Sequence, residues 1–480
     1  MPAMRRLRVL ALSTLIAFVF CAAARCEDSV PPSNGLTQKI DSYINVEGVK
    51  RGFVGLLVKS LKDGRTIYSH NSNQILIPAS CMKLLVTATA LDSLGPDFRL
   101  KTEVLSAGKL NDGTLVGDLI LKGYGDSSLE TKGLAEMADA VKAAGIKHVT
   151  GDLVADDSYF DSQRFGWGWS WDYEPASYAG PVSALVLNQN TTDVYVKPGS
   201  PGGPVVVTFG PPTDHFQIEN NVVTGPAGTK AALYVTRRRT TNVITVNGRF
   251  GADSKTDTTK LTVDDPALWI GDVFRQMLKD RGITIEGKLR RGVAPDGANV
   301  MNTHHSEPLS SVLEVINRHS VNVMAECLLK TLGAEKKGHG SYGSGMDVEN
   351  GFLARIGVAS DEVNISDGSG LSRCDMVSPN ALVTILSYMY KSPNSKVWID
   401  SLPVAGGDGT LYFSMKGTAA EGNLRAKTGN LGWVQSISGY VNTKGGEPLV
   451  FSLIVNNYKC SDNEIYRMRT RIGVALAEMQ

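Results

Sequence analysis

The sequence predicts an α+β fold in which a β-rich region interrupts a domain built from the two ends of the chain. Helical spacing of apolar residues is prominent in residues 34–100 and 290–480, whereas short alternating strands and glycine-rich turns dominate residues 101–289. With 42% hydrophobic and 20% charged residues in 480, the chain has enough apolar side chains for a large core. We therefore expect one discontinuous domain, 34–100 with 290–480, and an inserted β-rich region of one or more domains at 101–289.

The N-terminal part of the discontinuous domain has the patterns of a helix, a β-hairpin and a second helix. Residues 34–50 have helical spacing, and a strand, an Asp63-Gly64 turn and a second strand follow within Gly52–Ile67. Apolar spacing then predicts a helix over Ala79–Leu94, which the Gly95-Pro96 pair ends.

The inserted region is interrupted by two helical patterns, at Leu134–Ala144 and Ala267–Lys279. It also contains three of the six tryptophans of the chain, at Trp167, Trp169 and Trp171. We interpret this cluster as aromatic packing inside the insertion. The alternative is that these rings line a binding pocket.

The C-terminal part completes the discontinuous domain. Helical patterns cover most of 307–333 and 378–391. A strand at Asn423–Thr428 then precedes a hairpin of Trp433–Val441 and Pro448–Asn456, and a last helix follows. We therefore expect an antiparallel sheet packed with helices.

Residues 1–24 have the order of a secretory signal peptide. Arg5, Arg6 and Arg8 precede an apolar run over Val9–Cys21, and small residues follow up to Ala24. The run is shorter than the roughly 20 residues that a membrane-spanning helix needs. We expect an exported protein of the periplasm or cell envelope, with no stable membrane span after removal of the signal.

Charge and cysteine content exclude several classes of function. With 49 Lys+Arg against 48 Asp+Glu, the net charge of +1 offers no basic surface for nucleic acid. No Cys-x-x-Cys or His-Glu-x-x-His motif occurs, so we expect no metal site. Five cysteines remain after signal removal, so at least one is unpaired in an oxidising compartment; the sequence leaves their pairing open.

Two Ser-x-x-Lys motifs are candidates for a nucleophile and its base. On a helix, residues three apart share a face, so the lysine amine can reach the serine hydroxyl and take its proton. Ser80 is expected to open a helix with Lys83 one turn later, whereas Ser106 and Lys109 lie in a strand-and-turn stretch. Only Ser80 and Lys83 therefore have the required geometry. Taken alone, Ser80 is also explained as a helix N-cap.

The chain contains a single Lys-Ser/Thr-Gly motif, Lys427-Thr428-Gly429, on a predicted strand. A second lysine near the first lowers its pKa and can anchor a substrate carboxylate. A glycine on the strand lets a ligand backbone approach its edge. The alternative is an ordinary strand end before a turn.

Ser-x-Asn occurs five times, beginning at Ser69, Ser320, Ser378, Ser392 and Ser461. Two copies carry a central proline, Ser69 precedes the nucleophile, and Ser461 follows the Lys-Thr-Gly strand. Ser320-Val321-Asn322 lies between the other two motifs in a helical, apolar stretch, and we select it.

In this order the three motifs resemble the signature of penicillin-binding proteins and serine β-lactamases. Further stretches resemble one branch, the S13-type D-alanyl-D-alanine carboxypeptidases/endopeptidases (the DacB, or penicillin-binding protein 4, type). These stretches are Pro78–Lys83, Ser320–Glu326, Asp367–Arg373, Leu402–Leu411 and Ala426–Gly429. The resemblance implies a penicillin-recognising transpeptidase/β-lactamase-like domain with an insertion after the nucleophile. It also implies peptidoglycan stem peptides and β-lactam antibiotics as partners, and no cofactor.

The family's catalytic roles carry over by position. Ser80 corresponds to the acylated nucleophile and Lys83 to its base, and Ser320 relays a proton to the leaving D-alanine amine. The implied substrate-binding residues are Asn322, Lys427, Thr428, Gly429 and Asn430. Among these, Lys427 and Thr428 bind the terminal carboxylate, and the backbone N–H groups of Ser80 and Asn430 form the oxyanion hole.

Two residues depart from the family pattern. Val321 replaces the usual acid between Ser320 and Asn322, and Asn430 stands where a small hydroxyl residue is common. The second departure affects part of the expected contact with the carboxylate.

The same residues give less support to other functions. A β-lactamase needs a carboxylate for its deacylating water, and neither Glu349 nor Glu362 has the required sequence setting. No Gly-x-Ser-x-Gly elbow supports a Ser-His-Asp hydrolase. Cys81 would point away from Ser80 on a helix. A peptidoglycan-binding relative without turnover is the non-enzymatic alternative. The sequence leaves open carboxypeptidase against endopeptidase action, diamino-acid preference and oligomeric state.

Overall fold

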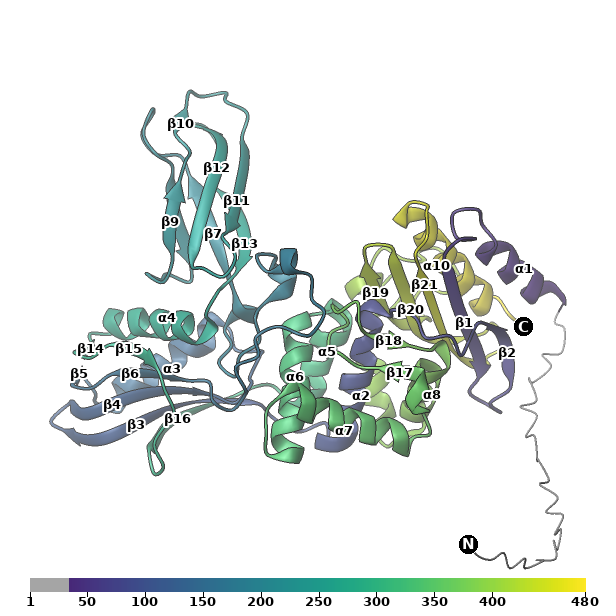
Figure 1. The fold of residues 1–480 in the computed structure, drawn as a ribbon, viewed down its shortest axis with the longest axis horizontal. Helices are drawn as coiled ribbons and strands as arrows, with labels where there is room; N and C mark the ends of the chain where they lie inside the picture. The colour runs from purple at the N-terminus through teal and green to yellow at the C-terminus, as the bar shows by residue number, and fades with distance from the viewer. Residues whose placement is uncertain (1–33) are drawn as a thin grey trace, which may run out of the picture.

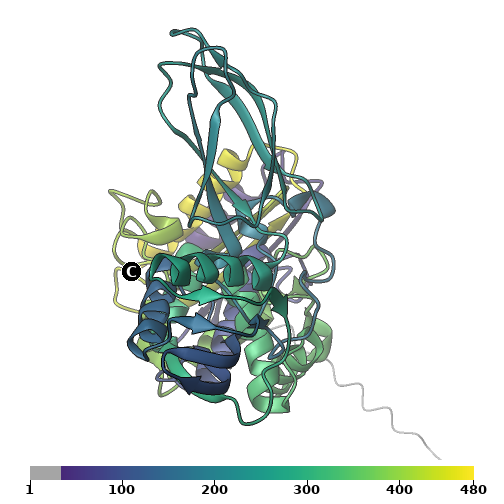
Figure 2. The same cartoon turned by 90° about the vertical axis from the view of Figure 1, so that its left-hand side faces the viewer.

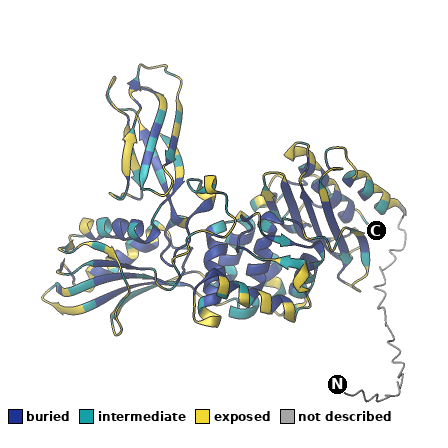
Figure 3. Ribbon diagram, in the orientation of Figure 1, coloured by how far each residue is buried: buried dark blue, intermediate teal, exposed yellow. Residues whose placement is uncertain are grey.

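The computed structural model describes residues 34–480, so the predicted signal peptide at 1–24 lies outside the described residues. Two parts are distinguishable in Figure 1: sheet-and-helix layers that contain the C-terminus, and an inserted part from which a narrow arm projects. Buried residues fill the interior of both parts in Figure 3. No helix of residues 34–480 is long and apolar enough to cross a membrane.

A five-stranded antiparallel sheet is built from both ends of the described chain, in the order β19-β20-β21-β1-β2. The strands β1, β20 and β21 are buried along almost their whole length, as expected for a sheet with helices on both faces. The N-terminal hairpin and the C-terminal hairpin are both confirmed. The strands are β1 (Phe53–Ser60), β2 (Thr66–His70), β19 (Arg425–Leu431), β20 (Val434–Asn442) and β21 (Pro448–Asn456).

Helices cover the two faces of this sheet. On one face, α1 (Asn34–Ile44) and α10 (Asp462–Ala477) pack on apolar residues of the strands. The other face meets a helical layer around α2 and α8, which share a larger core. The members of this layer are the 3₁₀ turn η1 (Ala79–Met82), α2 (Lys83–Leu94), α5 (Leu309–His319), α6 (Asn322–Lys337), α7 (Tyr342–Arg355), α8 (Pro379–Lys391) and α9 (Ser395–Ser401), with the short strands β17 (Val363–Asn364) and β18 (Met376–Val377).

The inserted part begins with a seven-stranded mixed sheet covered by two helices, and it has a core of its own. The two helices, α3 (Thr131–Ala143) and α4 (Pro266–Asp280), agree with the helical patterns of the sequence. The strands are β3 (Lys101–Asn111), β4 (Thr114–Gly123), β5 (His148–Val149), β6 (Leu153–Asp156), β14 (Thr284–Ile285), β15 (Leu289–Arg291) and β16 (Asn299–His305).

The arm consists of two small sheets and projects from this part in Figure 2. One sheet has the order β13-β7-β8, and in the other β12 pairs with β9, β10 and β11. The strands are β7 (Thr191–Lys197), β8 (Val206–Gly210), β9 (Gln217–Asn220), β10 (Thr224–Gly225), β11 (Ala232–Arg237), β12 (Val243–Gly251) and β13 (Asp257–Thr262).

The strand pairing bears on where the insertion ends. Strand β15 pairs with β6, and β16 pairs with β3, so the sheet of the inserted part includes residues beyond 289. We propose that the insertion runs from 101 to about 305 rather than to 289, because a sheet is a single packing unit.

Candidate active site

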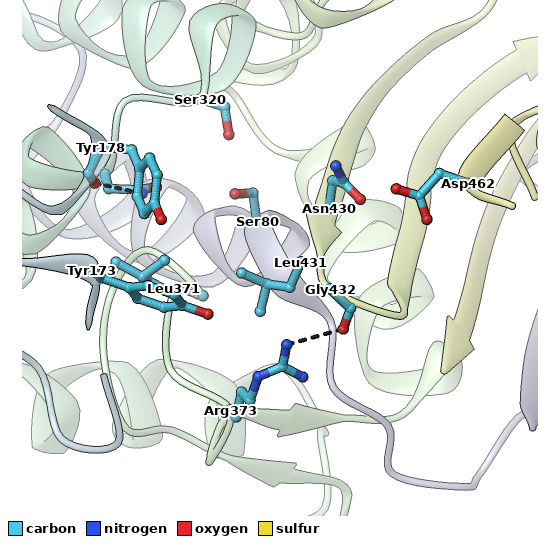
Figure 4. A pocket seen from close by; sticks show the side chains of 12 residues that line it. Ser80, Tyr173, Tyr178, Ser320, Leu371, Arg373, Asn430, Leu431, Gly432 and Asp462 are labelled. Carbon is cyan, nitrogen blue, oxygen red and sulfur yellow. Dashed lines mark hydrogen bonds between the residues drawn. The ribbon is translucent and has the colours of Figure 1, made fainter. Parts of the chain in front are cut away.

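A cavity of about 480 Å³ lies where the sheet, the helical layer and the insertion meet. Figure 4 shows the side chains of Ser80, Ser320 and Asn430 facing this cavity from three different elements. Ser80 comes from η1, Ser320 from the turn between α5 and α6, and Asn430 from β19. The structure therefore brings together residues that lie up to 350 positions apart in the chain.

Ser80 and Lys83 are adjacent, as the Ser-x-x-Lys spacing predicts. Lys83 Nζ lies 3.1 Å from Ser80 Oγ, 2.6 Å from Asn322 Oδ1 and 2.7 Å from the Ser369 carbonyl oxygen. The lysine is fully buried at the start of α2. Ser80 does not open the α-helix but lies in the 3₁₀ turn before it, directly after Ala79 in a left-handed conformation (φ 47°).

Burial governs the charge of Lys83. Loss of solvation lowers the pKa of its amine to about 8, although the nearby carboxyl groups of Asp367 and Glu326 favour the charged form. The same burial, together with Asp367, raises the pKa of Glu326 to about 8. A lysine whose pKa lies near neutral pH can exchange a proton with Ser80, whereas an ordinary surface lysine stays protonated.

Ser320 and Lys427 form a second serine–lysine pair. Lys427 Nζ lies 2.9 Å from Ser320 Oγ and 2.8 Å from the Thr428 carbonyl oxygen. The sequence placed Ser320 in a helical stretch, but that prediction is wrong for this residue: Ser320 caps α5 in a left-handed conformation (φ 59°). This turn separates α5 from α6 and directs the serine into the cavity.

The pKa of Lys427 is lowered further than that of Lys83, to about 7. Burial is the main cause, and the positive charge of Lys83 adds to it. From the sequence we expected the second lysine to lower the pKa of the first. The effect found runs the other way: Lys83 lowers the pKa of Lys427, whereas burial is what lowers the pKa of Lys83.

Gly429 allows β19 to pass directly beside the nucleophile. A Cβ atom at this position would lie 2.5 Å from the Pro78 carbonyl oxygen and 2.9 Å from the Ser80 nitrogen. Two further contacts tether the turn to the sheet: Ser436 Oγ donates to the Pro78 carbonyl, and Cys81 Sγ donates to the Lys427 carbonyl. The edge of β19 therefore lies against the backbone of Ser80.

Of the remaining motif residues, Asn322 and Asn430 line the same cavity, and Thr428 lies two residues before Asn430 on β19 without lining it. Asn322, the first residue of α6, donates from its amide nitrogen to the Tyr178 carbonyl at 2.9 Å, which links the site to the insertion. Thr428 Oγ1 donates to Thr410 Oγ1 at 2.8 Å. Asn430 is exposed at the cavity edge.

Several residues that line the cavity were not predicted as site residues: Tyr173, Tyr178, Leu371, Arg373 and Asp462. Leu371 and Arg373 belong to a stretch that the family resemblance had already singled out. The two tyrosines come from the insertion, and no local motif marks them. Asp462 is part of a Ser-x-Asn copy that we rejected, and that copy caps α10 through Ser461.

The structure also tests the alternatives. Ser106 and Lys109 lie within strand β3, and the side chain of Cys81 is buried beneath β19. Neither Glu349 nor Glu362 lines the cavity: Glu349 is buried in α7, and Glu362 accepts from Ser378 and Asn380. Within residues 34–480 no group of three potential metal ligands occurs, and the four cysteines are unpaired.

Two serine–lysine pairs, placed between an antiparallel sheet and a layer of helices, are the arrangement of the penicillin-recognising serine enzymes. The comparisons with known proteins agree with this class. The family model described as the D-Ala-D-Ala carboxypeptidase 3 (S13) family matches residues 36–479. The chain belongs to this family and is a serine-type D-Ala-D-Ala carboxypeptidase.

Individual relatives cover almost all of the chain. A D-alanyl-D-alanine carboxypeptidase of Actinomadura sp. (strain R39) is 36% identical over 92% of this chain and 84% of its own. The D-alanyl-D-alanine carboxypeptidase DacB of Haemophilus influenzae is 27% identical over 89% of both chains. The crystal structure of penicillin binding protein 4 from the same organism has the same fold, with a TM-score of 0.80 at 24% identity, covering 91% of this chain and 99% of its own.

Proposed function

We propose that this chain removes the terminal D-alanine from D-Ala-D-Ala stem peptides of peptidoglycan through an acyl-enzyme on Ser80, and that β-lactams acylate the same serine. The observation that carries the proposal is the set of three oxygen atoms within hydrogen-bond distance of the buried amine of Lys83. They are Ser80 Oγ, Asn322 Oδ1 and the Ser369 carbonyl oxygen.

Acylation begins with proton transfer from Ser80 to Lys83. A neutral amine has two N–H donors and one lone pair. Asn322 Oδ1 and the Ser369 carbonyl accept the two N–H groups, so the lone pair faces the Ser80 hydroxyl. Lys83 is then oriented as a general base before any substrate binds.

The tetrahedral intermediate requires donors for its oxyanion. The backbone N–H groups of Ser80 and Asn430 are the candidates, because β19 lies against the Ser80 turn at Gly429. Such donors contribute about 3 kcal/mol each to transition-state stabilisation when they are pre-organised.

Lys427 and Thr428 are the candidates for binding the terminal carboxylate of the substrate. A charge-assisted contact from a buried lysine is stronger than one between neutral groups. Lys427 also donates to Ser320 Oγ, so Ser320 can pass a proton to the leaving amine of D-alanine. Water then hydrolyses the acyl-enzyme.

The proposal favours a peptidase over a β-lactamase, because neither Glu349 nor Glu362 reaches the cavity to activate water. A β-lactam adduct should therefore persist. The proposed location is the periplasm or cell envelope, where peptidoglycan is found, and it rests on the signal-like residues 1–24.

Release of D-alanine from a peptide ending in D-Ala-D-Ala tests the proposal, with Ser80→Ala as the inactive variant and Ser106→Ala as the matched control. We expect full activity in Ser106→Ala and none in Ser80→Ala. A crosslinked muropeptide, assayed in parallel, measures endopeptidase action on the same site. Absence of D-alanine release by the folded wild-type protein contradicts the proposal.

A further inference from the structure

The three tryptophans of the insertion differ in their exposure and in their contacts. Trp167 and Trp171 are each 73% exposed, so these two are not packed inside the insertion as the sequence suggested. Trp171 stacks with Arg239 of the arm. Trp169 is instead half-buried, and its indole Nε1 donates to Asp367 Oδ2 at 2.7 Å. Trp169 therefore crosses from the insertion to a loop of the catalytic part.

Asp367 organises this loop, which runs from Ser366 to Arg373 behind the nucleophile. Its Oδ1 accepts the backbone N–H groups of Ser369 (2.9 Å) and Gly370 (2.6 Å), and its Oδ2 accepts that of Ser372 (2.8 Å). Because one carboxylate accepts three backbone N–H groups between residues 369 and 372, its position determines the course of the loop. The indole of Trp169 adds a side-chain donor from the insertion to this set, and the carboxyl group of Asp375 is a second side-chain partner of Asp367.

The loop presents an acceptor to the catalytic amine. The carbonyl of Ser369 receives Lys83 Nζ at 2.7 Å, and the following Gly370 (φ 77°) packs on the Ala79–Met82 turn. A Cβ atom on Gly370 would lie 1.9 Å from the Ala79 carbonyl oxygen. The loop therefore has no free space next to the nucleophile, and a displacement of Asp367 must move the Ser369 carbonyl.

The insertion is fitted closely to this loop. Gly168 has a φ of 78°, and a Cβ there would lie 2.7 Å from Ser372 Oγ and 2.8 Å from Cys374 Sγ. At the other end of the same segment, Asp161 Oδ1 lies 2.5 Å from the buried Lys330 Nζ. Lys330 lies two turns after Asn322 on α6. Segment 161–169 is therefore attached both to α6 and to the loop 366–373, the two elements that supply hydrogen-bond acceptors to Lys83.

We propose that Trp169 is a positioning residue for Lys83, acting through Asp367 and the Ser369 carbonyl. The inference rests on the proposed role of Lys83 as the base. The insertion then contributes to acylation without touching substrate, because it determines the direction of the lone pair on the amine. Loss of the indole donor should misalign proton transfer and leave substrate binding intact.

Charged and titratable groups around Lys83 decide how the pH profile responds. They are Asp367, Glu326, Cys81, Asp375 and Lys427. Without the indole N–H, the carboxylate of Asp367 has one donor fewer and its negative charge acts more strongly on the amine. The acid limb of the acylation rate should therefore move to higher pH.

The test compares Trp169→Phe with Trp167→Phe, the same substitution at an exposed ring two residues away. Acylation by benzylpenicillin is followed from pH 6 to pH 10, and turnover of a D-Ala-D-Ala peptide is resolved into kcat and KM. We expect Trp169→Phe to lower kcat about tenfold with KM unchanged, and to shift the acid limb upward. Trp167→Phe should match the wild type in every measurement.

A double-mutant cycle with Asp367→Asn identifies the route of the effect. If Trp169 acts through Asp367, Trp169→Phe has no further effect on kcat in the Asp367→Asn background. Additive effects, a loss confined to KM, or equal kcat in the two tryptophan variants would overturn the inference. Failure of the wild-type protein to be acylated at Ser80 would instead refute the proposed function.

Discussion

The serines of two serine–lysine pairs line the same cavity, and the two pairs differ in what surrounds the lysine. The amine of Lys83 has three oxygen atoms within hydrogen-bond distance and carboxyl groups nearby, of which Asp367 and Glu326 have the largest effect on its pKa. Lys427 has two acceptors and no carboxylate that raises its pKa; among the causes of its shift, Lys83 itself is the main charge. Both lysines are fully buried.

The different surroundings of the two lysines suit them to different chemical roles. Acidic neighbours offset part of the cost of burial for Lys83, whose amine is held by fixed acceptors in the geometry of a base. Lys427 lacks such compensation, so an incoming carboxylate is the partner that stabilises its charged form. One lysine is therefore suited to exchanging a proton and the other to binding an anion.

The largest effect is expected from removing the base. Lys83→Met should slow acylation by benzylpenicillin by about 10²- to 10⁴-fold, because general-base catalysis contributes that range. The rate is measured with a fluorescent penicillin. Lys109→Met, in the other Ser-x-x-Lys copy, is the control and should acylate at the wild-type rate. Equal rates for the two variants would show that Lys83 is not the base.

A smaller effect is expected at the second lysine. Lys427→Met should lower kcat/KM for a D-Ala-D-Ala peptide about 10- to 100-fold, since a hydrogen bond to a charged group is lost. The C-terminal amide of the same peptide should lose much less. The exposed Lys416→Met serves as the control. If acid and amide substrates lost the same factor, Lys427 would have no role in reading the carboxylate.

The pH dependence should distinguish the two lysines within one protein. The pKa values of about 8 for Lys83 and about 7 for Lys427 predict a bell-shaped kcat/KM profile with its maximum between pH 7 and 8. Activity falls at low pH because Lys83 gains a proton, and at high pH because Lys427 loses one. The amide substrate should keep the acid limb and lose the alkaline limb. An alkaline limb of equal size with the amide would contradict this assignment.

The smallest effect concerns Asn430, where the family more often has a hydroxyl residue. Asn430→Thr should lower KM for the acid substrate about threefold, by adding one hydroxyl donor to the carboxylate. Steady-state kinetics on acid and amide peptides measure it. A matching change with the amide would show that the residue at 430 does not contact the carboxylate.

Much of the fold follows from local patterns. The hairpins at both ends and helices α3, α4, α8 and α10 lie where apolar spacing predicted them. Helices α7 and α9 were missed. The first contains Gly343, Gly345 and Gly351, which weaken a helical pattern, and the second is only one to two turns long.

The residues of the candidate site that belong to a short sequence motif could be predicted. The features that depend on tertiary contacts could not. Ser80, Ser320 and Lys427 were selected from spacing and order. The structure places both serines at one cavity, with the buried Lys427 behind Ser320. The left-handed turn at Ser320 and the contact between Trp169 and Asp367 depend on packing between distant segments. No local pattern in a single sequence reports such contacts.

Intact-mass analysis with benzylpenicillin tests the central claim most directly, applied to wild type and Ser80→Ala. The account predicts a stable gain of one ligand mass in the wild type and none in Ser80→Ala. An adduct retained by Ser80→Ala would place the nucleophile elsewhere. Rapid hydrolysis of the drug without a lasting adduct would make the protein a β-lactamase and contradict the account.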